Sequence, residues 1–308
     1  MSDVRGIDSI RRAAREDASA DPRTDTLDPP GALSPHPVAD PTRSAPAAAA
    51  PYPRDRRWKV VAESVRGTSH EKSGAACQDS HFERIQSDEI LLAAIADGAG
   101  SASRSELGSA LAARTAVEAL QRWCSRSLPW PESDDEWASI MLGAMESARD
   151  AVEREADVQG ISSRELASTL ILLLATPLLV VGAQIGDGAA VVADAANNLT
   201  TLTVPQSGEY LNETMFLVSP QAVEQAQTAV WHGRVGFLAA FSDGLQMLAL
   251  RMSDSSPFTP FFAPLFRFIQ EQEDMGEARE QLRKFLVSPR VTQRADDDLT
   301  LLLAQCSD

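Results

Sequence analysis

The stretch STLILLLATPLLVVGAQI, residues 168–185, is the most informative part of the sequence about the fold of this chain. Two apolar runs, residues 168–175 and 178–185, lie on either side of Thr176-Pro177. Apolar runs of this length are typical of strands buried on both faces, and a proline between them favours a turn. The stretch therefore predicts a β-hairpin in the core. It is too short and too interrupted to span a bilayer, so no membrane association is expected.

Outward from this hairpin, the chain groups its strands and helices into blocks. Hydrophobic patterning predicts strands at 58–65, 90–96, 191–193, 199–204, 236–241 and 299–304, and helices at 103–124, 137–158, 261–272 and 276–286. Strands, then two long helices, then strands, helices and a last strand favour antiparallel sheets over alternating βαβ units. We expect an α+β fold, a four-layer α/β/β/α sandwich of two antiparallel sheets flanked by helices.

Both long helices carry apolar stripes at three- and four-residue steps, which predict their buried faces. The stripe of the first helix is Leu107, Leu111, Val117 and Leu120. The stripe of the second is Trp137, Ile140, Met141, Ala144, Met145, Ala148 and Val152. These side chains are expected to pack in the core.

Residues 1–55 differ from the rest of the chain. Half of the 18 prolines and the alanine run at 47–50 lie there, with almost no large apolar side chains. Such a segment cannot bury enough apolar surface to offset the entropy lost on ordering. We predict a disordered Pro/Ala-rich N-terminal tail over 1–55 and one folded domain over 56–308.

Composition excludes several classes of function. The net charge of -16, from 44 acidic against 28 basic residues, repels a phosphate backbone and argues against nucleic-acid binding. The three cysteines, Cys77, Cys124 and Cys306, form no CxxC pair, which argues against a thiolate zinc site and suits a reducing compartment. No apolar signal segment opens the sequence, so a cytoplasmic location is expected.

Aspartates recur where apolar strands end. Asp97, Asp187 and Asp243 stand in IADG, IGDG and FSDG, and Asp79 and Asp297 also adjoin strands. Converging carboxylates without His or Cys neighbours suit the hard cations Mg²⁺ and Mn²⁺. Asp-Gly is also a common turn pair, so on spacing alone these residues fit turns as well as cation ligands.

Seven motifs, in this order, resemble those of the metal-dependent protein phosphatases of the type 2C family, and in particular of its bacterial branch. They are GTSHEKSGAACQDSHF (67–82), AAIADGAGS (93–101), ASTLILLL (167–174), VVGAQIGDGAAVV (180–192), GEYLNETMFL (208–217), LAAFSDGLQML (238–248) and DDDLTLLL (296–303). The resemblance covers roughly residues 58–305.

The resemblance implies a centre with two Mn²⁺ or Mg²⁺ ions and, in some members, a third. It makes Asp97 the bridging ligand, with the Gly98 carbonyl on the second cation. It places Asp243 and Asp297 on the first cation. Asp79 would bind a cation or hold its water, and Asp187 would share a third cation with Asp243. A water between the two cations would then attack phosphorus directly, without a covalent intermediate.

Three positions depart from the family pattern. Gln78 replaces an acidic residue, Ala99 a histidine thought to protonate the leaving group, and Gly74 an arginine that binds phosphate. His70 or Lys72 are candidates for holding phosphate, and His70 also for donating a proton. A structural hydrogen bond is the interpretation of His70 that we favour.

Two functions follow from the resemblance. The first is a phosphoserine/phosphothreonine protein phosphatase, a monomer acting on phosphorylated proteins and opposing a Ser/Thr kinase. The alternative, motivated by Gln78, Ala99 and Gly74, is a catalytically weak or inactive module that binds phosphoproteins.

Overall fold

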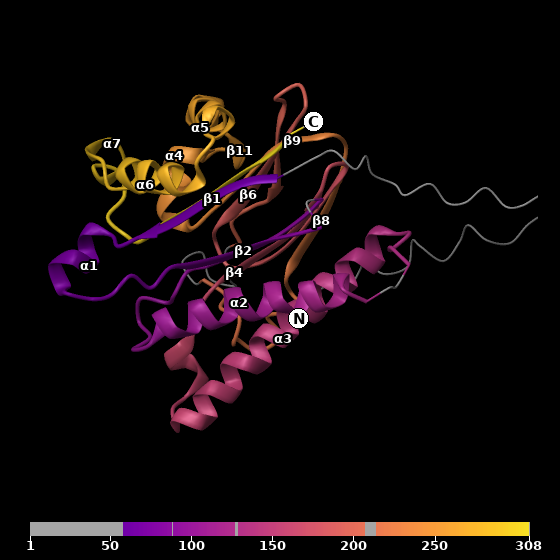
Figure 1. The fold of residues 1–308 in the computed structure, drawn as a ribbon. Coiled ribbons are helices and arrows are strands. Elements are labelled where there is room, and N and C mark those ends of the chain that lie inside the picture. The colour runs from indigo at the N-terminus through magenta and orange to yellow at the C-terminus, as the bar shows by residue number, and fades with distance from the viewer. Residues whose placement is uncertain (1–57, 88, 127–128, 207–213, 308) are drawn as a thin grey trace, which may run out of the picture. The chain divides into compact units, whose positions relative to one another are not determined.

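Figure 1 shows the computed structural model, which describes residues 58–87, 89–126, 129–206 and 214–307. The predicted tail over 1–55 and residues 208–213 of the GEYLNET motif lie outside these ranges. Within them, no helix is long and apolar enough to cross a membrane.

The decisive hairpin is confirmed. Strands β4 (Leu170–Thr176) and β5 (Leu179–Ile185) pair antiparallel from Thr176↔Leu179 to Leu170↔Ile185, and every residue in both is buried. They occupy the centre of a five-stranded sheet in the order β2-β3-β4-β5-β8. The other members of this sheet are β2 (Ser80–Gln86), β3 (Ile90–Ala96) and β8 (Gln227–His232).

A second antiparallel sheet has the order β1-β12-β9-β6-β7. Its strands are β1 (Trp58–Val65), β6 (Ala189–Asp194), β7 (Leu199–Thr203), β9 (Val235–Phe241) and β12 (Leu299–Cys306). Successive residues of a strand point to opposite faces of the sheet, so a fully apolar strand contributes alternate side chains to two different hydrophobic cores. Leu91 and Ile95 of β3 join the core between the sheets, whereas Leu92 and Ala94 join the core under the helices.

Helices cover both outer faces, so the predicted four-layer sandwich is confirmed (Figure 1). Helices α2 (Ser105–Cys124) and α3 (Asp134–Gln159) pack on the first sheet. Helices α5 (Thr259–Glu271) and α6 (Met275–Leu286) pack on the second. Shorter elements complete the described chain: α1 (Thr68–Ser73), η1 (Ser163–Leu166), η2 (Asp243–Leu245), α4 (Gln246–Ala249), β10 (Leu250–Arg251), β11 (Ser256–Pro257) and α7 (Pro289–Thr292).

The predicted buried face of α2 was partly wrong, and in the stripe of α3 Ile140 is only half-buried. Leu107 is 37% exposed, and Leu111 is only half-buried. The helix instead buries small residues, namely Gly108, Ser109, Ala112, Ala113 and Ala116, beside Val117 and Leu120. Small side chains let the backbone of α2 approach its neighbours closely, and that approach replaced the leucine stripe as the packing surface.

Strands β2 and β8 were not predicted because neither has an apolar run. Both lie at the edges of their sheet, where residues are half-exposed and polar positions are tolerated. The remaining predicted strands and helices agree with the structure to within about three residues at each end.

Candidate metal centre

One end of the two sheets collects the aspartates that follow or precede strands. Asp97 follows the last residue of β3, and Asp79 precedes β2, whose first residue pairs with Ala96. Asp243 follows β9, while Asp297 comes just before β12, which runs antiparallel to β9. In antiparallel neighbours the end of one strand lies beside the start of the next, so these carboxylates lie at the same end of the sheets.

Asp97, Asp187 and Asp243 form the central cluster. One carboxylate oxygen from each lies within 4.8 Å of the others. Burial, followed by the negative charges of Asp79 and Asp243, raises the pKa of Asp97 well above its usual range. Burial likewise raises the pKa of Asp243, and the charges of Asp187 and Asp297 act in the same direction. These carboxylates repel each other unless positive charge is supplied.

Asp79 is 6% exposed, and its two carboxylate oxygens differ in their hydrogen bonds. Its Oδ2 accepts hydrogen bonds from the Ser242 hydroxyl at 2.7 Å and from the Thr300 hydroxyl at 2.8 Å. Its Oδ1 is buried and has no hydrogen-bond partner within the described part of the chain. Burial raises the pKa of Asp79 to about 7 despite the two hydroxyl donors.

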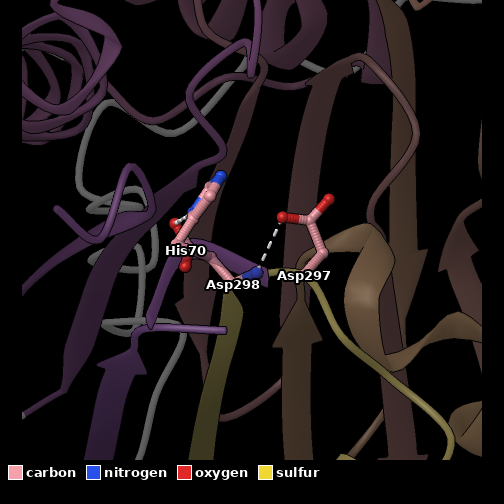
Figure 2. A group of neighbouring side chains, drawn as sticks. All are labelled: His70, Asp297 and Asp298. Carbon is pink, nitrogen blue, oxygen red and sulfur yellow. Dashed lines mark hydrogen bonds and ion pairs between the residues drawn. The ribbon is translucent and has the colours of Figure 1, made fainter. Parts of the chain in front are cut away.

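A second group contains His70, Asp297 and Asp298, whose candidate ligand atoms also lie within 4.8 Å of one another. Figure 2 shows the His70 ring and the Asp297 carboxylate rising side by side from the backbone. Asp298 was overlooked as a site residue in the sequence, yet it is the buried member, 3% exposed. Its position directly before the leucine-rich strand β12 was the available signal.

Asp298, directly before β12, accepts hydrogen bonds from the segment that precedes β2. Its Oδ1 accepts the Gly67 N–H at 2.7 Å, and its Oδ2 accepts the Gln78 N–H at 2.6 Å. His70 Nδ1 lies 2.9 Å from the same Oδ2. Asp298 N–H in turn donates to Asp297 Oδ1 at 2.8 Å, which orients the exposed carboxylate of Asp297 (Figure 2).

The backbone around Asp97 is fixed by its neighbours in space. Asp97 N–H donates to Thr169 Oγ1 at 3.0 Å, and Thr169 N–H donates to the Asp97 carbonyl at 2.8 Å. Gly98 N–H donates to the Gln78 carbonyl at 3.2 Å. A Cβ at position 98 would lie 2.7 Å from that carbonyl oxygen, so only glycine allows this approach.

Asp187 lies on a turn whose backbone carbonyls are contacted by the buried side-chain amide of Gln184. Gln184 Nε2 lies 3.0 Å from the Gly186 carbonyl, 2.7 Å from the Gly188 carbonyl and 3.0 Å from the Val204 carbonyl. Thr214 Oγ1 donates to Asp187 Oδ2 at 2.7 Å. Neither Gln184 nor Thr214 was predicted as a site residue, because their role depends on contacts with residues 2 to 27 positions away in the chain.

The three departures from the family pattern lie around the same loops. Ala99 is 4% exposed, and Gly74 ends α1 in a left-handed conformation at φ 77°. Gln78 leaves its side-chain Oε1 buried without a hydrogen-bond partner among the described residues. None of the three supplies a charge to the centre.

The oxygen ligands that the aspartates of this centre offer are suited to binding divalent cations. The cluster offers carboxylate oxygens, and the buried Oδ1 atoms of Asp79 and Asp243 have no hydrogen-bond partner among the described residues. Unpaired buried carboxylates are costly, and oxygen donors suit Mg²⁺ or Mn²⁺ better than zinc.

The raised pKa values predict how stability depends on pH when cations are absent. Asp79 titrates near 3.8 in the unfolded chain and at about 7 in the folded one, so the folded state binds more protons between these values. The free energy of unfolding of the metal-free protein should therefore fall as pH rises from 4 to 7. Thermal unfolding in EDTA checks this, with saturating Mn²⁺ as the control that removes or reverses the trend. Higher stability at pH 7 than at pH 5 in EDTA would contradict it.

The molecule is a four-layer sandwich with a cluster of carboxylates at one end of its sheets, and known proteins share this architecture. Residues 66–287 match the family model described as protein phosphatase 2C, and the chain belongs to that family. The chain is 36% identical over 255 residues to serine/threonine-protein phosphatase 3 of Escherichia coli K12, a match covering 80% of this chain and 98% of that protein.

Solved structures agree on the fold. PppA of Pseudomonas aeruginosa, described as a key regulatory component of T6SS, superposes with a TM-score of 0.53 at 18% identity, covering 82% of this chain and 98% of that one. The catalytic domain of the phosphatase PstP, solved in complex with 2 manganese ions, gives 0.53 at 17% identity, covering 82% and 100%. At these identities the likeness shows the fold alone.

Proposed function

We propose that this chain hydrolyses phosphoserine and phosphothreonine in proteins, using two Mn²⁺ or Mg²⁺ ions. The observation that carries the proposal is the cluster of Asp97, Asp187 and Asp243, half-buried together without a basic partner among the described residues that could neutralise them. In this proposal Asp97 would be the ligand shared by both cations, the Gly98 carbonyl would bind the second, and Asp243 and Asp297 would complete the shell of the first. Asp187 takes part in a third, weaker cation site.

Bound divalent cations would supply a water of lowered pKa and would neutralise charge on the phosphoryl oxygens. The remaining work is done by side chains of this chain. Asp79 uses Oδ2 for Ser242 and Thr300, which leaves Oδ1 to orient the attacking water. The rigid Asp97-Gly98 backbone keeps the reacting groups in position, which lowers the entropy lost in reaching the transition state.

His70 is proposed as a residue that orients the loop at the rim of the centre. Its Nδ1 faces Asp298, while the ring stands beside the Asp297 carboxylate (Figure 2). A direct role in binding phosphate or in protonating the leaving group stays a prediction. A His70→Gln variant separates these roles, because loss of phosphate contact raises KM, whereas loss of a proton donor lowers kcat.

Hydrolysis of a phosphothreonine peptide tests the proposed function. Activity is expected with Mn²⁺ or Mg²⁺ and should disappear when EDTA removes the cations. Calorimetric titration with Mn²⁺ provides the second readout, and at least two bound ions are expected. A chain that binds phosphopeptide but neither hydrolyses it nor binds cations at millimolar concentration would instead be the non-catalytic binding module.

The partner in this proposal is a phosphorylated protein, together with the Ser/Thr kinase that this phosphatase opposes. A cytoplasmic monomer suits that role. Size-exclusion chromatography with light scattering tests the oligomeric state directly, since a dimer would have twice the mass of 33.1 kDa.

A further inference from the structure

A line of hydrogen bonds joins the surface of α6 to the buried Asp79. Arg279 Nη2 lies 2.9 Å from His81 Nε2, and His81 Nδ1 lies 2.8 Å from Ser64 Oγ. Ser64 Oγ lies 2.7 Å from Thr300 Oγ1, which donates to Asp79 Oδ2 at 2.8 Å. We call these four residues, Arg279, His81, Ser64 and Thr300, the relay. They come from four separate elements: α6, β2, β1 and β12.

The chemistry of the two ends fixes the direction of every bond in the relay. A guanidinium can only donate, so His81 Nε2 accepts from Arg279. The neutral ring then carries its proton on Nδ1 and donates to Ser64. At the other end the Asp79 oxygen accepts from Thr300, so Thr300 must accept from Ser64. When Asp79 is ionised, each hydroxyl is both donor and acceptor, and no alternative arrangement satisfies both ends.

Arg279 is itself held in place at the outer end. Its Nε donates to the Ala62 carbonyl at 3.0 Å and lies 3.1 Å from Glu63 Oε2. Glu63 belongs to β1, immediately before Ser64. The guanidinium is about half exposed, whereas Thr300 is fully buried. The relay therefore connects solvent to the interior at the edge where β1 and β2 lie near each other.

We propose that Arg279, His81, Ser64 and Thr300 are positioning residues that commit Asp79 Oδ2 to hydrogen bonding and so present Oδ1 to the cation centre. Two further contacts support this role. Ser242 also donates to Oδ2, and Thr300 N–H donates to Ser242 Oγ at 3.0 Å, so every donor converges on the same oxygen. Oδ1, to which none of the residues that the structure describes donates a hydrogen bond, is the atom available to a cation or its water. The inference rests on the proposed function, which puts Asp79 at that centre.

A proton pathway is the competing interpretation of such a line of groups. Transfer along a hydrogen-bonded line requires each bond to reverse after a proton has passed. Arg279 cannot accept a hydrogen bond, so the line cannot reverse while the arginine is bound to His81. Because the direction of these hydrogen bonds is fixed, we favour a role in orienting Asp79 over a role in conducting protons.

The histidine tautomer tests the relay in the metal-free protein. Nitrogen-15 NMR near pH 7 should find His81 neutral and protonated on Nδ1, with the signal assigned by its loss in His81→Asn. In Arg279→Met, protonation of Nε2 should appear, since that nitrogen has lost its donor. Arg283→Met is the matched control, because Arg283 lies on the exposed face of the same helix and pairs with Glu280. A ring protonated on Nε2 in the wild type would overturn the inference.

Mn²⁺ affinity tests the effect on the centre, with calorimetry as the readout rather than activity. Thr300→Val removes the hydroxyl while keeping the shape of the side chain, and it should weaken binding by about 10- to 100-fold, as losses of outer contacts to metal ligands do. Thr300→Ser restores the hydroxyl and should return affinity to within about threefold of the wild type. Equal affinity for Thr300→Val and the wild type would overturn the inference while leaving the proposed function intact.

The proposed function can fail separately. If the wild type binds no Mn²⁺, the assignment of a cation centre is wrong, and the inference that the relay serves one is overturned with it. The His81 tautomer would then show only whether the hydrogen bonds of the relay have the stated directions. If the wild type binds Mn²⁺ and both Thr300→Val and Arg279→Met weaken binding, both proposals are supported.

Discussion

Asp97→Asn is expected to lower the rate of phosphopeptide hydrolysis by about 1,000-fold or more, equivalent to roughly 4 kcal/mol of transition-state stabilisation. The carboxylate of Asp97 is the one whose pKa is raised by Asp79, Asp243 and Asp187 together. An amide in its place supplies no negative charge to bridge two cations. Measuring kcat/KM at saturating Mn²⁺ tests the expectation.

The same substitution should act in the opposite direction on the metal-free protein. Removing one of several repelling buried carboxylates should raise the unfolding temperature in EDTA. Asp150→Asn, on the exposed surface of α3, is the control that should change neither quantity. Full activity of Asp97→Asn would remove Asp97 from the proposed centre, and a lower unfolding temperature would contradict the repulsion argument.

Gly108→Ala is expected to destabilise the fold by about 3 kcal/mol, although glycine to alanine inside a helix ordinarily stabilises it by about 1 kcal/mol. A Cβ at position 108 would lie 1.9 Å from the backbone oxygen of Leu166. The backbone of α2 approaches η1 too closely for any side chain. Denaturant unfolding of the two proteins measures the difference.

Gly143→Ala in α3 is the matched control, because no atom of the described residues, apart from those of its own helix turn, lies within 4 Å of the added carbon. It should stabilise the protein by about 1 kcal/mol. Gly108→Ala should also lower activity, since the segment after η1 supports the centre: Ala99 N–H donates to the Ala167 carbonyl, and Thr169 holds Asp97. Equal, stabilising effects of both substitutions would contradict the close packing at Gly108.

Patterning alone predicted most of the fold. The hairpin around Thr176-Pro177 and strand β3 were predictable because a continuous apolar run has few alternatives to a buried strand. The face of α2 was not, since alanine gives little hydrophobic contrast and its packing depends on how closely the helices approach. The edge strand β2 could not be recognised because its polar residues gain their partners only from other elements.

The candidate site shows the same division. The positions of Asp97, Asp187 and Asp243 followed from strand ends and Asp-Gly pairs, and the structure brings these three together. Asp297 lies instead beside His70 and Asp298, with its charge acting on Asp243. The supporting groups were missed because their contacts span many residues: 221 residues separate Thr300 from Asp79 in the chain.

Anomalous diffraction from crystals soaked in Mn²⁺ would locate the cations themselves. We expect at least two anomalous peaks, one between Asp97 and Asp243 and one on the side of the Gly98 carbonyl, with Asp297 contacting the first. Peaks confined to the protein surface, or none beside Asp97, in a soak that saturates the calorimetric sites would contradict a cation centre at these strand ends.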